Sequence, residues 1–124
     1  MLLEQALSEA VVGALIEVHR VLGPGLLESV YRRCLCRELE LRGLSYRCEV
    51  PLPITYKGIE LDAGYRMDVI VEEKILIELK AVNEMNPVFE AQLLTYLKLS
   101  GLRIGYIANF NVALMIDGLK RMVR

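Results

Sequence analysis

Two carboxylates and an ammonium group, on Asp68, Glu78 and Lys80, are spaced so that they could form one charged site. Lys80 lies two residues beyond Glu78, so both side chains share a face if this segment is a β-strand. Two carboxylates supply hard oxygen ligands and leave positions open for water, which suits Mg²⁺ or Mn²⁺. These residue types therefore indicate a divalent-cation site with a cationic neighbour, provided that the two acids lie opposite each other.

The length of the turn between the two acids decides whether they meet. Two runs of mainly apolar residues, 65–71 and 75–81, flank the polar segment Glu72-Glu73-Lys74, which predicts a β-hairpin. A two-residue loop would mix polar and apolar side chains on both faces. A three-residue loop pairs Asp68 with Glu78, Arg66 with Lys80 and Ile70 with Leu76 on one face, and it sorts the remaining apolar residues onto the other face. That face would carry Tyr65, Met67, Val69 and Val71, opposite Ala81, Leu79, Ile77 and Ile75. Because a one-residue slip reverses every side chain, we predict the three-residue loop.

The predicted register has an electrostatic cost. It places two carboxylates with Cβ atoms roughly 4.5–5.5 Å apart, so one of them is expected to be driven toward protonation unless a cation lies between them. A divalent ion bound by Asp68, Glu78 and the backbone carbonyl of Leu79 would remove this repulsion. Lys80, opposite Arg66, would then orient a water molecule or stabilise the charge that develops on a phosphate.

A second motif lies near the N-terminus, in the segment Gly25-Leu26-Leu27-Glu28-Ser29-Val30-Tyr31, preceded by His19-Arg20-Val21-Leu22-Gly23-Pro24. Together with Asp68 and Glu78-Leu79-Lys80, it resembles the signature of the GxxExxY protein family, which is assigned to the PD-(D/E)xK nuclease-like superfamily. The resemblance extends from about Leu7 to Val123. Tyr65-Arg66 stands where many superfamily members have a proline before the aspartate, a departure that removes no ligand.

The resemblance implies a restriction-endonuclease-like core and Mg²⁺-dependent or Mn²⁺-dependent hydrolysis of phosphodiester bonds in nucleic acid, either DNA or RNA. In that superfamily the acidic pair holds the metal ion and the lysine assists an attacking water molecule. The resemblance also assigns Glu28 and Gln92 to an outer shell of the site. On its residue type alone, Gln92 is equally well an exposed amide.

Glu28 and His19 each have a structural alternative that the sequence leaves open. Glu28 is expected in the first turn of a helix, where a carboxylate also stabilises the helix dipole by about 0.3–1 kcal/mol. His19 is the only histidine, and near a helix end it suits a structural hydrogen bond as well as proton transfer near neutral pH. The candidate substrate-binding residues are Tyr31, His19, Arg20, Arg32 and Arg66.

The elements that must position these residues predict an α/β fold. Helical apolar spacing covers about 3–22 and 26–42, with Leu27, Val30, Cys34 and Leu41 on the core side of the second helix. Asn86-Pro87 begins a crossover helix that runs to about Leu99. Strands are expected at 45–56, at the hairpin, at 103–109 parallel to 75–81, and at 119–123. Pro51 and Pro53 limit the first of these to an edge strand or a bulge. We predict a single domain, 1–124, in which a mixed central β-sheet is flanked by two N-terminal helices and one crossover helix.

The composition limits the classes of partner. The formal net charge is -1 over 124 residues, so binding of nucleic acid must depend on a local patch and the metal ion rather than on an overall basic charge. Hydrophobic residues make up 54% of the chain, which favours a homodimer or another partner. No apolar run reaches the roughly 18 residues of a membrane span, and no basic segment resembles a signal peptide.

The three cysteines, Cys34, Cys36 and Cys48, are expected to be small buried residues in a reducing cytoplasm. Side chains two residues apart on a helix diverge, which disfavours a shared zinc ion or a disulfide between the first two. Two alternatives to a nuclease remain open. One is a non-catalytic interaction or assembly module that has the nuclease fold, and the other is an enzyme that acts on a small-molecule phosphate.

Overall fold

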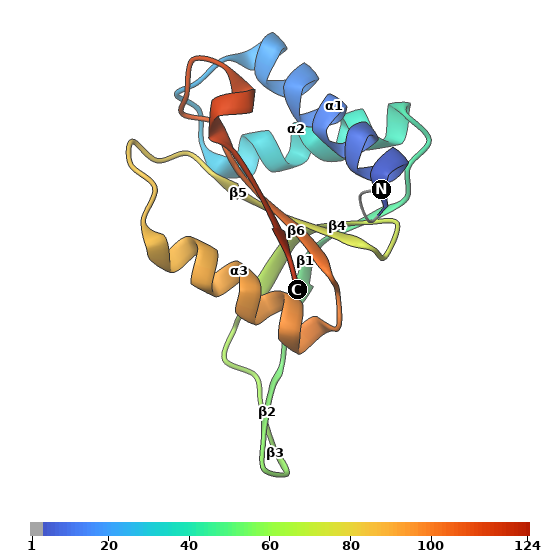
Figure 1. Ribbon diagram of the computed structural model, residues 1–124, viewed down its shortest axis with the longest axis vertical. Helices are drawn as coiled ribbons and strands as arrows, with labels where there is room; N and C mark the ends of the chain where they lie inside the picture. Colours follow the sequence, from blue (N-terminus) through green and yellow to red (C-terminus); the bar gives the residue numbers. More distant parts are fainter. Residues whose placement is uncertain (1–3) are drawn as a thin grey trace.

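Three helices and a mixed five-stranded sheet form the body of the fold in the computed structural model, which describes residues 4–124 (Figure 1). The helices are α1 (Gln5–Leu22), α2 (Glu28–Leu41) and α3 (Pro87–Ser100). The sheet has the order β1-β4-β5-β6-β7. Its strands are β1 (Tyr46–Pro51), β4 (Arg66–Val71), β5 (Ile75–Lys80), β6 (Ile104–Asn109) and β7 (Leu119–Val123). The predicted start of the first helix at Leu3 lies outside the described residues.

The sheet separates two layers of helices. In Figure 1, α1 and α2 lie together on one face of the sheet and α3 lies on the other. The crossover through α3 makes β5 and β6 parallel, and every other neighbouring pair in the sheet is antiparallel. This arrangement confirms the predicted α/β fold, in which two N-terminal helices and one crossover helix flank a mixed sheet. None of the helices in the described part of the chain has the length and apolar character needed to cross a bilayer.

The buried side of α2 differs from the predicted one. Tyr31, Leu35 and Leu39 are fully buried, and their spacing of four residues forms a single stripe along the helix. By contrast, Leu27 is 73% exposed and Leu41 is 64% exposed. The predicted core side was wrong because Leu27 is the N-cap and Leu41 the last residue of α2, so both lie at the margins of the packed region. Val30 is also exposed, and only Cys34 of the predicted set packs against the core.

The cysteines are only partly buried. All three are free thiols. Cys36 is buried and Cys34 is half-buried, but Cys48 is exposed on β1, the strand at the edge of the sheet. The prediction of a buried residue was therefore wrong for Cys48.

The β4–β5 hairpin has the predicted register. Val69 pairs with Ile77 and Val71 pairs with Ile75, which leaves the three-residue loop 72–74 between the strands. Glu72 and Glu73 adopt positive φ values of 53° and 55°, a left-handed conformation that closes the turn. One part of the predicted sorting was wrong: Met67 packs in the apolar cluster that contains α3 residues, and Val69 and Val71 belong to the cluster beneath α1 and α2.

The predicted strand over 45–56 is divided in two at its prolines. β1 ends at Pro51, and β2 (Ile54–Tyr56) pairs instead with β3 (Ile59–Leu61) in a separate hairpin. Lys57 and Gly58 form its two-residue turn with φ values of 46° and 86°, as the type I′ geometry requires. Figure 1 shows that this hairpin projects away from the body of the molecule.

The crossover helix α3 begins and ends where the sequence predicts. The Asn86 side chain accepts a hydrogen bond from the backbone N–H of Val88 at 2.9 Å, and Pro87 occupies the first helical position. Gly101, with a φ of 81°, ends the helix. Leu93, Tyr96 and Leu97 form the buried face of α3, in the same apolar cluster as Ile70 and Leu76 of the sheet.

Candidate functional site

The side chains of Asp68 and Glu78 cross between β4 and β5 and bind the backbone of the opposite strand. Glu78 Oε2 accepts a hydrogen bond from the N–H of Asp68 at 2.9 Å. Asp68 Oδ2 accepts one from the N–H of Leu79 at 2.8 Å. The regular pairing of the two strands ends at Val69 and Ile77. Each carboxylate therefore replaces a backbone partner of the other strand, and the two acids lie side by side in the gap between the strands.

The opposite side of β4 is distorted at the same level. β1 pairs with β4 at Cys48 and Val69, and again at Val50 and Met67. Between these pairs lies Glu49, with a φ of 51°. A non-glycine residue at positive φ costs on the order of 1–3 kcal/mol and marks a site worth examining for function. Asp68 thus lies where the sheet is irregular on both sides, which explains why the alternation of side chains fails at Met67.

Burial and mutual repulsion make the acidic pair reluctant to ionise. Glu78 is buried, and this burial, together with repulsion from Asp68, raises its pKa to about 8. Burial also raises the pKa of Asp68, although the Leu79 N–H and the charges of Arg32 and Lys80 oppose the shift. Both acids are therefore shifted toward the protonated form, as the sequence predicted for at least one of two opposed carboxylates.

Arg32 is the closest cation to Asp68. Its Nη1 atom lies 3.5 Å from Asp68 Oδ1, and its Nη2 atom lies 3.2 Å from Glu49 Oε1. The side chain is 19% exposed. It projects from α2 one turn beyond Glu28, so α2 delivers a carboxylate and a guanidinium to the same region.

Lys80 is the second cation of the site. Its side chain is half-buried, and its Nζ atom lies 4.4 Å from the centre of the Phe89 ring on α3. An ammonium group over an aromatic face is attracted by the ring quadrupole. The charge of Lys80 lowers the pKa values of both acids. Phe89 was not predicted as a site residue, since an aromatic residue on an apolar helix face gives no separate signal.

Glu28 ties the start of α2 to the end of β5. Its Oε2 atom accepts a hydrogen bond from the N–H of Ala81 at 3.0 Å, and its charge raises the pKa values of both Asp68 and Glu78. The structure thus brings Glu28 close to the acidic pair, although the helix that carries it is distant from β5 in the sequence.

Gln92 lies on α3 between Phe89 and Tyr96 in the sequence. It is half-buried, three residues after Phe89 and four before Tyr96, so the three side chains are neighbours on the helix surface. Phe89 contacts Lys80. The pKa of Tyr96 is raised by burial and by the charges of Glu78, Tyr65 and Asp68. Gln92 therefore lies between one residue that contacts Lys80 and another whose pKa is raised by the acidic pair.

Tyr31 and His19 are engaged elsewhere. Tyr31 is fully buried and stacks on Phe110 with ring centres 4.2 Å apart. Its hydroxyl donates to the Gly23 carbonyl at 2.6 Å and accepts from the N–H of Leu26 at 3.1 Å. His19 is also buried and donates from Nε2 to the carbonyl of Val112 at 2.9 Å. Both residues hold the segments around the turn that precedes Glu28.

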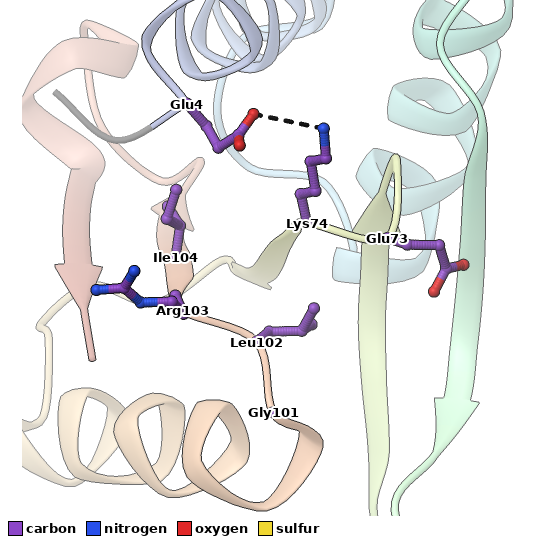
Figure 2. Close-up of a pocket in the computed structure, with 7 residues that line it drawn as sticks. All are labelled: Glu4, Glu73, Lys74, Gly101, Leu102, Arg103 and Ile104. Carbon is purple, nitrogen blue, oxygen red and sulfur yellow. Dashed lines mark ion pairs between the residues drawn. The ribbon is translucent and has the colours of Figure 1, made fainter.

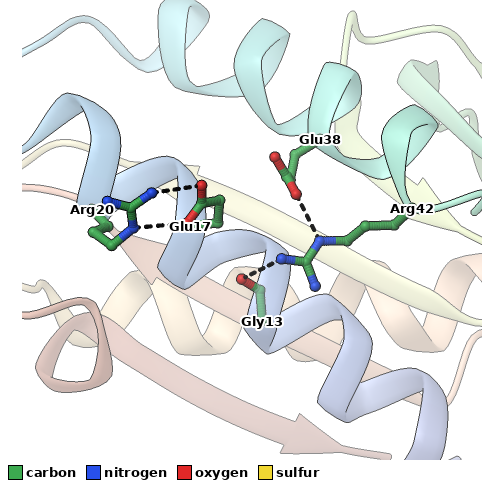
Figure 3. A network of polar contacts seen from close by, with 5 residues as sticks. All are labelled: Gly13, Glu17, Arg20, Glu38 and Arg42. Carbon is green, nitrogen blue, oxygen red and sulfur yellow. Dashed lines mark hydrogen bonds and ion pairs between the residues drawn. The ribbon is translucent and has the colours of Figure 1, made fainter.

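Arg20 and Arg66 make their hydrogen bonds to residues other than the acidic pair. Arg20 is exposed and makes two hydrogen bonds of 2.8 Å to Glu17 on the same helix (Figure 3). Arg66 is exposed and donates to the carbonyl of Tyr65 at 3.0 Å. Of the predicted arginines, only Arg32 contacts a residue of the acidic pair.

Asn109 is a buried polar residue that was not predicted from the sequence. It is 3% exposed at the end of β6 and pairs in register with Lys80. Its side chain accepts from the N–H of Val82 at 3.1 Å and donates to the Val82 carbonyl at 3.0 Å. A polar residue that ends a buried strand of a parallel pair is the signal that could have identified it.

The loop end of the same hairpin contains a different pocket. A cavity of about 170 Å³ is lined there by Lys74, Glu4 and the segment 101–104 (Figure 2). Its acid and base already neutralise each other, because Lys74 Nζ lies 3.6 Å from Glu4 Oε1. This cavity lies at the end of the hairpin opposite to Asp68 and Glu78, so it is not part of the acidic site.

The donor set at the open end of the hairpin fits a hard divalent cation. Four carboxylates, Glu28, Glu49, Asp68 and Glu78, face two cations, Arg32 and Lys80. With all four acids ionised, the cluster would carry two more negative than positive charges, a difference that one Mg²⁺ would balance. Within residues 4–124 no group of three or more His, Cys, Asp or Glu side chains could hold a metal ion. A bound ion would therefore use the two central carboxylates, with backbone oxygen and water as its other ligands, as Mg²⁺ commonly does.

The chain belongs to the PD-(D/E)XK nuclease superfamily, because residues 5–122 match the model of that family. Its three helices and mixed sheet agree with the restriction-endonuclease-like fold that the sequence predicted. Membership indicates a nuclease-type function with a nucleic acid substrate, and nucleases of this superfamily typically use divalent metal ions. No curated protein and no solved structure matches the chain.

Proposed function

We propose that this protein is a phosphodiesterase that hydrolyses nucleic acid with the help of Mg²⁺ or Mn²⁺. The observation that supports this proposal most strongly is the reciprocal crossing of the Asp68 and Glu78 side chains. Nothing in the stability of a sheet requires two acids at one level of a hairpin, where like charges are destabilising. Their arrangement, between Lys80 and Arg32, suits an ion that must be held beside a phosphate.

Asp68 and Glu78 would hold the ion, with the carbonyl of Leu79 as a third oxygen. When bound, such an ion polarises a phosphate oxygen and lowers the pKa of a bound water molecule. Lys80 orients the attacking water and stabilises the charge that develops on the phosphate. The contact with Phe89 supports this role, because it limits the positions that the ammonium group can take.

Glu28 and Gln92 would act around this centre. Glu28 receives the Ala81 N–H and so fixes the end of β5 directly after Lys80. Gln92, between Phe89 and Tyr96 on α3, orients water or phosphate. Arg32 is the predicted phosphate ligand with the best support, because it already contacts Asp68. The contacts of Tyr31 and His19 support a positioning role.

We also propose that the chain belongs to the GxxExxY family within this superfamily. Three residues of its motif act on one turn in this chain. Gly25 adopts a φ of 98°, which favours glycine, and Tyr31 binds the backbone of residues 23 and 26. The Glu28 side chain accepts a hydrogen bond from the N–H of Ala81, directly after β5. Each of the three motif residues therefore has a structural role: Gly25 allows the turn, Tyr31 binds its backbone, and Glu28 connects it to the residue after β5.

The direct test combines metal binding with cleavage. Calorimetric titration with Mg²⁺ and Mn²⁺ should show binding to the wild-type protein, and single-stranded DNA, duplex DNA, branched DNA and RNA should be assayed for cleavage. Lys80→Ala should lower the cleavage rate by about 10²–10³-fold, the range for the loss of one transition-state donor. Asp68→Asn should abolish metal binding and cleavage. Lys98→Ala, which removes an exposed lysine from α3, is the matched control.

Cleavage that survives both Lys80→Ala and Asp68→Asn would contradict this assignment of the site. Metal binding without cleavage of any of the four substrates would favour a non-catalytic module.

Assembly as a homodimer in the cytoplasm is a further part of the proposal. The β2–β3 pairing places Ile54, Tyr56, Ile59 and Leu61 on one face of the projecting hairpin, and the last three of these are at least half exposed. An isolated two-stranded hairpin is marginally stable in water, so a second copy that covers this face would stabilise it. The three free thiols support a reducing compartment.

Sedimentation equilibrium tests this assembly. The wild-type protein should dimerise, Ile59→Lys should weaken the dimer, and Thr55→Lys on the polar face should not. A wild-type protein that stays monomeric at all concentrations contradicts the proposal.

A further inference from the structure

The guanidinium of Arg32 lies on the one oxygen of Asp68 that the fold leaves available. Asp68 Oδ2 is held by the N–H of Leu79 at 2.8 Å. Asp68 Oδ1 faces Arg32 Nη1 at 3.5 Å. An ion bound by Asp68 through its available oxygen would therefore approach the place that Arg32 already neutralises.

The contacts of Arg32 with its two acidic partners are long, so the guanidinium could be displaced from Asp68. A charge-assisted hydrogen bond between nitrogen and oxygen is about 2.7–2.9 Å long, and the contacts of Arg32 with Asp68 and Glu49 are 3.5 and 3.2 Å. The guanidinium is thus shared between two acids without a short bond to either. Glu49 is 61% exposed, so it anchors Arg32 from the solvent side of the cluster.

We propose that Arg32 is a displaceable counter-ion of Asp68, which competes with the divalent cation and passes to a phosphate group of the substrate when the cation binds. This inference rests on the proposed function and adds a coupling between its two ligands. A guanidinium keeps its charge in proteins, so Arg32 cannot relieve its repulsion from an incoming cation by losing a proton. It must move, and its planar fork of N–H donors matches a phosphate.

The exchange makes metal and phosphate binding cooperative. A phosphate that takes Arg32 removes a competitor from Asp68, which strengthens cation binding. Linkage requires the reciprocal effect, so the cation strengthens phosphate binding by the same factor. Glu49 sets the strength of the exchange, because it shares the guanidinium with Asp68 in the absence of a cation.

Calorimetric titration with Mg²⁺ and with Ca²⁺, in the absence of nucleic acid, measures the competition directly. Arg32→Ala should tighten cation binding by about tenfold, since it removes one partly screened charge beside the ligand. Arg33→Ala removes the same charge from the next, exposed position of α2 and should leave the affinity unchanged. Circular dichroism melts of each variant establish that the protein is folded.

A double-mutant cycle with Glu49 separates this role from a structural one. Glu49→Gln should weaken cation binding in the wild-type background, because Arg32 then has Asp68 as its remaining partner. In the Arg32→Ala background the same change should have no comparable effect. A role of Arg32 in packing alone would give equal effects of Glu49→Gln in both backgrounds, which would overturn the proposal.

The phosphate arm uses a short single-stranded oligodeoxynucleotide with Ca²⁺, monitored by fluorescence anisotropy. Saturating Ca²⁺ should tighten its binding to the wild-type protein and to Arg33→Ala, and this coupling should be reduced in Arg32→Ala to the part that comes from direct attraction between cation and phosphate. Arg32→Lys keeps the charge without the fork, so it should retain near-wild-type cation affinity but show weaker coupling.

The outcomes distinguish the two proposals. If the wild-type protein binds no divalent cation, the proposed function fails and this inference fails with it. If the wild-type protein binds the cation and Arg32→Ala binds it equally or more weakly, Arg32 is not a competitor, although the proposed function stands.

Discussion

The two ends of the β4–β5 hairpin differ in what holds the strands together. At the loop end, three pairs in succession are regular and every side chain in them is buried: Val69 with Ile77, Ile70 with Leu76, and Val71 with Ile75. At the open end, one residue further on each strand, the pairing is replaced by bonds between carboxylates and backbone amides. The same two strands thus provide a packed core at one end and a charged opening at the other.

The contrast shows how a sheet can open without losing its hydrogen bonds. A buried backbone N–H without a partner costs free energy comparable to a lost hydrogen bond. Asp68 and Glu78 avoid that cost, because each carboxylate accepts an N–H from the opposite strand. The strands are then free to separate at the open end, where the proposed ion would enter, while the buried pairs at the loop end hold the register.

The largest effect is expected from a cavity at the loop end. Ile77→Ala removes a fully buried side chain from the centre of the ladder and should lower the free energy of unfolding by about 2–5 kcal/mol. Urea denaturation measures this loss. Because the change leaves the carboxylates intact, the folded variant should bind Mg²⁺ with wild-type affinity. A loss of metal affinity larger than the loss of folded protein would show that the two ends are not separable.

A smaller effect is expected from pH at the open end. Folding raises the pKa of Glu78 to about 8 from an ordinary value of 4.5. Between these values the folded protein binds more protons than the unfolded chain, so the free energy of unfolding should fall as the pH rises through this window. Because Glu78 and Asp68 repel each other and so titrate together, the loss should stay below that of an isolated carboxyl group with the same pKa.

Denaturation in EDTA at pH 5.5 and pH 8 measures this dependence. Glu78→Gln should flatten it, because the amide does not titrate. Added Mg²⁺ at pH 8 should restore stability to the wild-type protein and not to the variant. If the free energy of unfolding changed equally with pH in the two proteins, the titration of Glu78 would not be the source of the pH dependence.

The same contrast explains how much the sequence could predict. The loop end follows from apolar alternation alone, and the register derived from it is confirmed. At the open end the alternation fails at Met67, because charge and the positive φ of Glu49 determine the backbone there. Glu49 was not predicted as a site residue, because no local sequence pattern indicates that it pairs with Arg32. The pairing of Arg32 with Asp68 joins α2 to β4, and such a contact depends on how the helix packs.

The smallest effects come from a matched pair of strained residues, one at each end of the hairpin. Glu73 in the loop and Glu49 beside Asp68 both adopt positive φ and both pair with an arginine. Glycine relieves this backbone strain, so Glu73→Gly and Glu49→Gly should each raise the melting temperature by about 2 °C once the added flexibility of glycine is counted. The two variants should differ in function. Glu73→Gly loses an exposed ion pair with Arg47 and should leave the affinity for the cation unchanged. Glu49→Gly removes one of the two acids that share Arg32, so Arg32 should stay beside Asp68 and weaken the binding of the cation. Equal cation affinity in the two variants would show that Glu49, like Glu73, is only a surface partner, and that the open end needs no anchor outside the gap between its strands.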